Sequence, residues 1–482
     1  MSDRRPGYHF TPAQHWMNDP NGLVHLDGTH HLFFQHNPRA NEWGNMSWGH
    51  ATSTDLVHWT EHPVALVHRP EEQIFSGCVV VDHHNTSGFG ETGGPAPLVA
   101  VYTSVYADGR QAQSLAFSLD AGSTWTTYDA NPVLDRGSRH FRDPKVFWHA
   151  TGQDAGHWVM VAVEAEDRLV LLHRSDDLTS WTPLSTFDPG DGAEGFLECP
   201  DLFELPIDGD ADRSLWVLVV SVNPGSPAGG SGTRYHLGEF DGTTFTVLSD
   251  DTTVPEERRW LDWGRDFYAA VSFDNAPDGR RIMIGWMSNW DYAHVVPTEP
   301  WRGAMSLPRE LSLRTVADRV TLVQRPAPEL AVLEGSPSPV TPGPFVLTGE
   351  LAVPGGPRYR LDVTFDHVDA TELGLDLCVG RDEVTRLRYE PGTGTLSLDR
   401  RASGDSGFSP SFASVDRAPV ALEEGRLRLE VYVDVGSVEV FAQGGTACLT
   451  QLVFPDPDST GLALVSAGGT TLVHELVHRP IT

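Results

Sequence analysis

Short apolar runs recur along most of the chain, and each is separated from the next by Gly, Pro, Asn or Asp. Four of them are THHLFFQHN at 29–37, PLVAVYTSV at 97–105, HWVMVAVEA at 157–165 and LWVLVVSV at 215–222. Runs of this length that are rich in β-branched and aromatic residues are typical of strands, whereas the 3.6-residue period of an amphipathic helix is scarce. The pattern predicts an all-β chain.

A turn element returns in phase with these strands. It is STDLVHWT from Ser53, SLDAGSTWT from Ser118, SDDLTSWT from Ser175 and, more weakly, FDGTTFT from Phe240. In Ser-x-Asp the short polar side chains bond back onto the turn, and the following Trp packs between neighbouring sheets. A repeat of roughly sixty residues suits the four strands of a propeller blade. We therefore expect a five-bladed β-propeller over residues 1–325.

The pattern changes at QRPAPELAVLEGSPSPVTPGP, where Pro, Ser and Gly indicate a linker over 326–344 with one possible short helix. Beyond it the apolar residues alternate cleanly, as in RYRLDVTF at 358–365 and TLVHELVHR at 471–479. Alternation of this kind indicates sheets with one buried and one solvated face. We expect a C-terminal β-sandwich over 345–482, which either braces the propeller or binds substrate, and bracing is favoured.

Composition narrows the possible partners. The net charge is −32 and no basic stripe interrupts it, which argues against nucleic acid or an anionic membrane as partner. No segment has the length and hydrophobicity of a membrane span or a signal peptide, so a cytoplasmic location is expected, or secretion if a signal was trimmed. The four cysteines are far apart and are expected to be free thiols. No metal-binding motif occurs, and neither a metal nor a cofactor is expected.

Polar residues recur at the spacing of the blades. Asp19, Ser76, Asp143, Glu198 and Asp262 are separated by 57, 67, 55 and 64 residues. Taken singly, each motif favours a structural interpretation. NDPNG around Asp19 favours a turn, RDP around Asp143 favours an ion pair on the surface, and EC at Glu198 favours an ordinary glutamate of an edge strand. The innermost strands of a propeller converge on one axis, however, so residues at one phase of the repeat meet in space. The spacing predicts a cluster of carboxylates at that axis.

Two carboxyl groups facing one cavity are what glycoside cleavage requires, one as an acid and the other as a nucleophile. Indole and phenyl rings near these motifs offer apolar faces to sugar rings, and amide and guanidinium groups offer hydrogen bonds to hydroxyls. The aromatic candidates are Trp16, Trp43, Trp48, Phe75, Trp286 and Trp290, and the polar ones are Asn18, Gln35 and Arg142.

These motifs together resemble glycoside hydrolase family 32, the family of invertases, levanases and exo-inulinases. The resemblance covers HFTPAQHWMNDPNGLVHLDGTHHLFFQHNP, WGNMSWGHATSTDLVHW, FSGC, FRDPKV, ECPDLFEL, WLDWGRDFYAAVSF and, in the second domain, VDVGSVEVFAQGG. It extends over nearly the whole chain, and its three acidic motifs in this order are highly specific. The fold it implies, a five-bladed propeller followed by a β-sandwich, is the one that the spacing predicts.

The resemblance also implies roles for individual residues. It implies that Asp19 is the nucleophile, that Glu198 is the acid/base and that Asp143 holds sugar hydroxyls and stabilises the transition state. The positions that resemble the pocket for a terminal fructosyl unit are Asn18, Gln35, Trp43, Trp48, Phe75, Ser76 and Arg142, with Asp262 and Trp286 as further candidates.

The stretch SNWDYAHVVPTEPWRGAMSLPREL resembles levanases and exo-inulinases more than plant invertases. The sequence therefore predicts a retaining, exo-acting β-fructosidase that takes small fructosides of the levan or inulin type and also sucrose. Four alternatives remain: a sucrose-specific invertase, a fructosyltransferase of the same family, a non-catalytic fructan-binding protein and, from the SLDAGSTW turn, a sialidase. Linkage preference, chain-length preference and oligomeric state are left open.

Overall fold

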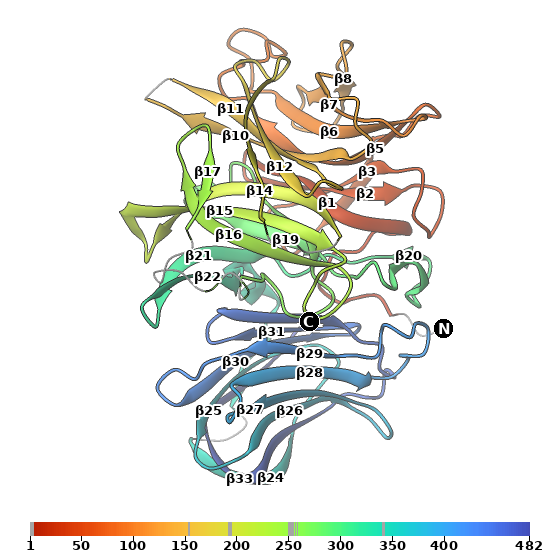
Figure 1. Ribbon diagram of the computed structural model, residues 1–482. Helices are drawn as coiled ribbons and strands as arrows, with labels where there is room; N and C mark the ends of the chain where they lie inside the picture. Colours follow the sequence, from red (N-terminus) through yellow and green to blue (C-terminus); the bar gives the residue numbers. More distant parts are fainter. Residues whose placement is uncertain are drawn as a thin grey trace.

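The computed structural model describes residues 4–152, 155–190, 195–248, 255, 257, 259–339 and 343–482. Two domains of strands lie one above the other, the first coloured red to green and the second teal to blue (Figure 1). Among the described residues, no helix has both the length and the apolar character needed to span a membrane.

Four-stranded blades build the first domain, each with its first strand innermost. Blade 1 contains β1 (His15–Leu26), β2 (Thr29–Asn37), β3 (Ser47–Ser53) and β4 (Thr60–Leu66). Blade 2 contains β5 (Glu72–Val81), β6 (Leu98–Tyr106), β7 (Gln111–Ser118) and β8 (Thr126–Thr127), with β9 (Leu134–Asp135) beside β7. Blade 3 contains β10 (Phe141–Ala150), β11 (Gly156–Glu164), β12 (Leu169–Ser175) and β13 (Thr182–Phe187).

Blades 4 and 5 complete the ring. Blade 4 contains β14 (Phe196–Ile207), β15 (Asp210–Asn223), β16 (Gly232–Phe240) and β17 (Phe245–Val247). Blade 5 contains β18 (Tyr268–Ser272), β19 (Ile282–Trp286), β21 (Arg309–Val316) and β22 (Arg319–Pro326). The innermost strands contact one another in the order β1, β5, β10, β14, β18 and back to β1. The short β20 (Trp301–Arg302) lies between β19 and β21 in the chain and pairs in parallel with β1, so the connection within blade 5 also fastens blade 1.

Apolar side chains fill the space between consecutive blades, and the recurring turn contributes to this packing. In three of the turns the Trp indole donates a hydrogen bond back to the turn: Trp59 to Leu56 O at 3.0 Å, Trp125 to Gly122 O at 3.2 Å and Trp181 to Leu178 O at 2.8 Å. The three rings pack against three different inter-blade clusters. The turn therefore has the structural role that its sequence predicts.

The second domain is a sandwich of two sheet layers joined by one long strand. Its strands are β23 (Ser338–Pro339), β24 (Phe345–Val353), β25 (Tyr359–His367), β26 (Glu372–Val379), β27 (Val384–Glu390), β28 (Thr395–Ala402), β29 (Val415–Pro419), β30 (Arg426–Asp434), β31 (Ser437–Ala442), β32 (Ala447–Leu452) and β33 (Gly461–Pro480). The first half of β33 pairs with β26 and its second half with β25, so the strand passes from one layer to the other. Gly468, at φ 65°, lies between the two halves, in a conformation that favours glycine.

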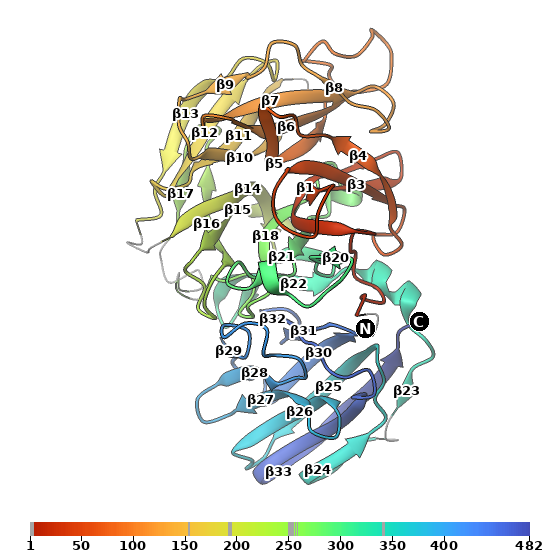
Figure 2. The same cartoon turned by 90° about the vertical axis from the view of Figure 1, so that its right-hand side faces the viewer.

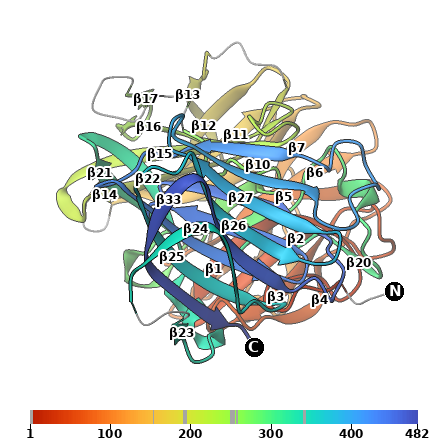
Figure 3. The same cartoon turned by 90° about the horizontal axis from the view of Figure 1, so that it is seen from below.

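The connection between the domains contains a 3₁₀ helix, η4 (Pro328–Leu333), where the sequence predicts a short helix. Within the predicted linker, residues 340–342 lie outside the described residues. Strand β32 lies against the propeller, because Cys448 O accepts a hydrogen bond from Trp263 N at 2.8 Å and Thr450 O accepts one from Asp266 N at 3.1 Å. Figure 2 shows this contact from the side, and Figure 3 shows the sandwich strands lying across the propeller.

Candidate active site

All five innermost strands carry a β-bulge of one residue, and these bulges build the site. The pairing register shifts between Met17 and Pro20, Phe75 and Gly77, Arg142 and Lys145, Glu198 and Asp201, and Tyr268 and Val271. A bulge re-aims the side chains beside it and bends its strand. At three of the bulges the extra residue has a left-handed backbone: Asp143 at φ 60°, Cys199 at φ 47° and Ala269 at φ 52°.

Residues at the bulges of blades 1 to 4 line one pocket of about 380 Å³. It contains nine of the twelve residues predicted for the site: Asn18, Asp19, Gln35, Trp43, Phe75, Ser76, Arg142, Asp143 and Glu198. They come from blades 1 to 4, so residues that are remote in the sequence meet on one surface, as the blade spacing predicts.

Asp19 is held by hydrogen bonds on both carboxylate oxygens. Asn18 Nδ2 donates to Oδ1 at 2.9 Å, and Ser76 Oγ donates to Oδ2 at 2.6 Å. Asn18 is itself fixed, because its Oδ1 accepts a bond from the Trp16 indole at 2.7 Å. Burial raises the pKa of Asp19, the bond from Ser76 opposes that rise and the charge of Glu198 adds to it. The donors thus stabilise an anion in a site that is poor in water.

Asp143 is the most buried of the three acids in the pocket. Its Oδ2 accepts a hydrogen bond from Cys199 N at 3.0 Å, and its own backbone N–H donates to Thr103 Oγ1 at 2.9 Å. Burial raises the pKa of Asp143 to about 7, although the Arg142 guanidinium opposes the rise. A carboxyl of this kind exchanges a proton near neutrality and can both donate to and accept from a sugar hydroxyl.

Glu198 differs from Asp143 in exposure and in partners. Its side chain is 22% exposed, against 5% for Asp143. Arg142 Nη2 donates to Oε1 at 3.0 Å, and the Tyr268 hydroxyl donates to Oε2. Burial, with Glu198 beside it, keeps the pKa of Tyr268 well above its usual value, so Tyr268 remains a proton donor. Glu198 is therefore oriented by two donors and still reached from the pocket mouth.

Three predicted aromatic residues, Trp16, Trp48 and Trp286, do not line the pocket. Trp16 is fully buried and donates its indole N–H to Asn18 Oδ1. Trp48 is fully buried in the core between blades 1 and 2 and donates its indole N–H to Phe75 O at 3.0 Å. Trp286 is 1% exposed and lies behind Trp290, with 4.9 Å between the ring centroids. All three rings support the wall rather than forming it, because blade packing covers them.

The predicted role of Asp262 in the pocket is wrong. Asp262 is buried between the two domains, where it pairs with Arg309 at 3.0 Å and accepts hydrogen bonds from Thr450 N at 2.8 Å and Thr450 Oγ1 at 2.7 Å. The interval that selected it misses the bulge of blade 5, which follows Tyr268. Asp262 precedes that innermost strand and points toward the sandwich.

Several residues at the site were not predicted as part of it. Those that line the pocket are Gln111, Arg139, His140 and Phe196, and those behind it include Tyr268 and Cys199. Trp290, one of the predicted aromatic candidates, also lines the pocket. Phe196 is 39% exposed at the pocket, and its ring stacks on His140 with an interplanar angle of 10°. The interval between Glu198 and Tyr268 is close to the blade repeat and was a signal for Tyr268, whereas no comparable signal marked Phe196.

An axial propeller pocket with three carboxyl groups, aromatic walls and amide donors defines a carbohydrate-cleaving enzyme, a glycoside hydrolase. The chain belongs to glycosyl hydrolases family 32, because the family's N-terminal domain matches residues 9–326 and its C-terminal domain matches residues 336–479. The family resemblance, the five-bladed propeller and the C-terminal sandwich are thereby confirmed.

Individual relatives match over nearly the whole chain. A levanase of Bacillus subtilis (strain 168) is 44% identical, over 99% of this chain and 70% of its own length. An extracellular exo-inulinase of Aspergillus niger is 43% identical, over 97% of this chain and 92% of its own. The crystal structure of an exo-inulinase from Aspergillus awamori superposes with a TM-score of 0.93 at 40% identity, covering 100% of this chain and 99% of that one.

Proposed function

We propose that the protein is a retaining, exo-acting β-fructosidase that removes terminal fructose from small fructosides. The observation that carries the proposal is the pairing of Asp19 and Glu198 in one pocket with different environments. Asp19 accepts hydrogen bonds from Asn18 and Ser76, whereas Glu198 pairs with the Arg142 guanidinium and its side chain is 22% exposed. Levanases and exo-inulinases among the relatives support fructans as the substrate class.

In the proposed mechanism Glu198 protonates the glycosidic oxygen while Asp19 attacks the anomeric carbon of the terminal fructosyl unit. A covalent fructosyl-enzyme forms through a transition state of oxocarbenium character, and the leaving sugar departs with the proton from Glu198. Glu198, now a carboxylate, removes a proton from water, and the resulting attack releases fructose and restores Asp19. Two displacements at one carbon retain its configuration.

Asp143, Arg142 and the aromatic walls have supporting roles in this proposal. Asp143 binds fructosyl hydroxyls, and its bond from Cys199 N fixes the carboxyl orientation. Arg142 connects two of the acids, since it bonds Glu198 at 3.0 Å and lies 3.8 Å from Asp143. Trp43, Phe75 and Trp290 offer apolar ring faces to the sugar. The exo-inulinases among the relatives support attack at a chain end.

Phe196 is suited to the sugar on the leaving side of the scissile bond. Its exposed ring lies two residues before Glu198 and is flanked by His140 and by the Arg142 guanidinium, 5.8 Å from its centroid. We include levan-type and inulin-type oligosaccharides and sucrose among the substrates. A fructosyltransferase remains the second candidate, because the same covalent intermediate would form and a sugar rather than water would intercept it.

Time courses with sucrose, 1-kestose, levanbiose, inulin and levan test the proposal. Fructose alone should appear from the earliest points, and early di- or oligosaccharide products from the polymers would contradict exo attack. With methanol as acceptor, methyl β-fructofuranoside should form if configuration is retained, and the α anomer would reject the double displacement. Asp19→Ala and Glu198→Ala should each abolish turnover while leaving the thermal transition in place. The predicted cytoplasmic location stays a prediction, since the exo-inulinase relatives are named as extracellular.

A further inference from the structure

The segment that follows β19 connects the pocket with the second domain. Trp290 lines the pocket, and its ring stacks on Trp16 with 6.0 Å between centroids and an interplanar angle of 26°. Two residues further on, Tyr292 is only 1% exposed and packs with Phe412 of the sandwich. One short stretch of chain therefore has a pocket wall at one side and a domain contact at the other.

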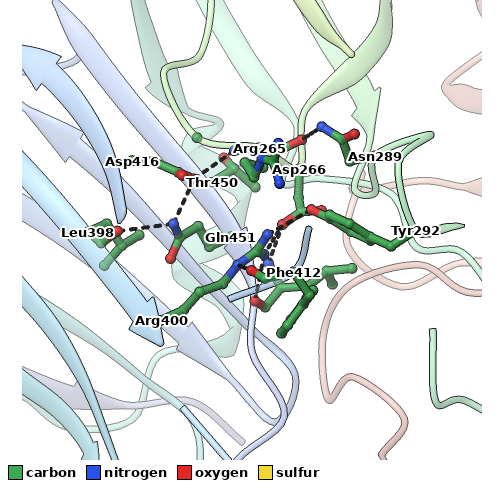
Figure 4. Close-up of polar contacts among 12 residues, drawn as sticks. Arg265, Asp266, Asn289, Tyr292, Leu398, Arg400, Phe412, Asp416, Thr450 and Gln451 are labelled. Carbon is green, nitrogen blue, oxygen red and sulfur yellow. Dashed lines mark hydrogen bonds and ion pairs between the residues drawn. The ribbon is translucent and has the colours of Figure 1, made fainter. Parts of the chain in front are cut away.

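Arg400 of strand β28 reaches this segment from the sandwich (Figure 4). Its Nη2 donates to the Tyr292 hydroxyl oxygen at 2.8 Å, and its Nη1 donates to Asp266 Oδ2 at 2.6 Å. The Tyr292 hydroxyl in turn donates to Asp266 Oδ1 at 2.6 Å, which closes a triangle of three buried groups. A buried guanidinium and carboxylate must keep their partners, because an unpaired buried charge is costly. The position of Tyr292 is thereby specified.

The other side of the segment is fixed within the propeller. Asn289 is fully buried and its side-chain amide donates to Arg265 O at 2.8 Å and to Ser231 O at 3.1 Å. Asp291 pairs with the Arg265 guanidinium at 3.1 Å. The sandwich holds Tyr292, on the C-terminal side of Trp290, through the triangle described above and through the ring of Phe412. It also reaches Arg265, whose guanidinium donates to Ser411 O.

We propose that Tyr292 and Arg400 are positioning residues, through which the second domain holds the Trp290 wall of the pocket in its binding position. The physical reason is that Trp290 lies on an irregular loop, so the position of its ring depends on the contacts that neighbouring loop residues make. The sandwich then contributes to substrate binding without touching the sugar. The kinetic part of this proposal rests on the proposed fructosidase activity, because it uses a fructoside as substrate. The structural part, the position of Trp290, does not depend on that activity.

Tyr292→Phe is the variant of choice, because it removes one hydroxyl and keeps the ring in the apolar cluster. We expect KM for 1-kestose to rise roughly tenfold and kcat to change by less than about twofold, since the variant loosens binding and leaves the acids in place. Trp290→Ala should raise KM at least as much. If Tyr292 acts through Trp290, the double variant should match Trp290→Ala, because neighbours that act as one unit are not additive.

Tyr432→Phe is the matched control. Tyr432 is also a buried tyrosine at the domain interface, in a cluster with Tyr8, Leu307 and Leu330, and its hydroxyl donates to Glu430 at 3.1 Å. Within the described part of the chain, its neighbours are this cluster, Glu430 and the Arg360 guanidinium, none of which belongs to residues 287–295 around Trp290. Its variant should therefore lower Tm and leave KM unchanged. An equal rise of KM in Tyr432→Phe would reduce the effect to general bracing and overturn the proposal.

A readout without substrate separates this proposal from the proposed function. The difference in acrylamide quenching between a protein and its Trp290→Ala partner isolates the Trp290 fluorescence. That contribution should be quenched more strongly in Tyr292→Phe than in the wild type. A wild type that releases no fructose would reject the fructosidase and leave this test intact. Unchanged quenching in Tyr292→Phe would reject the positioning role. A double variant whose rise in KM equals the product of the rises in Tyr292→Phe and Trp290→Ala would reject it as well.

Discussion

Asp143→Asn is expected to make the protein more stable at pH 8 while it removes a group from the site. The pKa of Asp143 is raised by burial from 3.8 to about 7, so the folded state holds a proton that the unfolded state has already released. Between these two values the stability of the folded state falls as pH rises, because the unfolded state binds fewer protons. Above pH 7 the full penalty for a buried charge applies.

The size of the effect follows from the two pKa values. A difference of about three units corresponds to about 4 kcal/mol at pH 8 and to about 1 kcal/mol at pH 4.5. Asparagine keeps the acceptor for Cys199 N and carries no charge, so the variant avoids this penalty. An unfolding entropy of about 2.1 cal/mol/K per residue makes each kcal/mol worth about 1 °C in a chain of this length. We therefore expect Tm to rise by about 4 °C at pH 8 and by about 1 °C at pH 4.5.

Differential scanning fluorimetry at the two pH values measures the effect, and Asp434→Asn is the control of opposite sign. The pKa of Asp434 is lowered, despite burial, by hydrogen bonds that include one from His9. That carboxylate stabilises the fold above its ordinary pKa, so its variant should lose stability at pH 8. If Asp143→Asn gains nothing at pH 8, or gains equally at both pH values, the reasoning about desolvation is wrong.

Three further predictions concern the interface and the acid. Asp262→Asn should lower Tm by weakening the contact with Thr450 and leave kcat/KM within about twofold in kinetic assays, whereas a large kinetic loss would restore Asp262 to the site. His9, held between two carboxylates, has its pKa raised from 6.5 to about 9, so its contribution is complete below pH 6.5 and is lost as pH rises through 9. The fall of Tm between pH 7 and 9.5 should therefore be smaller in His9→Gln than in the wild type. Tyr268→Phe removes one of the two donors that orient the Glu198 carboxyl, so kcat should fall while KM changes little, and an unchanged kcat would exclude that role.

The carboxylates were predictable from the sequence because their motifs are local and their spacing repeats. Asp19, Asp143 and Glu198 each lie within three residues of an aromatic side chain on the first strand of a blade, and one propeller axis gathers them. The turns at Ser53, Ser118 and Ser175 were equally predictable, since the bond from Ser to Asp closes within two residues. Periodicity and hydrogen bonding between near neighbours can both be recognised in a single sequence, so these features could be predicted from it.

Whether other side chains point into the pocket or into the packed interior was decided by the tertiary structure. A one-residue bulge reverses the face of the residues beside it. The repeat interval selected Asp262, which precedes strand β18, whereas the bulge of that strand follows Tyr268. Trp48 and Trp43 have the same chemistry in sequence, yet one fills the core between two blades and the other lines the pocket. These outcomes depend on which surfaces of remote strands meet.

By itself, the sequence determined the strand content, the repeat, the order of the two domains and the three acids. Each of these shows in short apolar runs or in motifs of a few residues that can be recognised without the tertiary structure. The contact between Arg400 and Tyr292 joins residues 108 positions apart. The orientation of the Phe196 ring at the pocket depends on its stacking against His140, which is 56 positions away in the sequence. Such pairings arise when whole sheets pack, which no local pattern encodes. The tertiary structure alone therefore decided which aromatic rings face the pocket and which residues of the second domain hold them there.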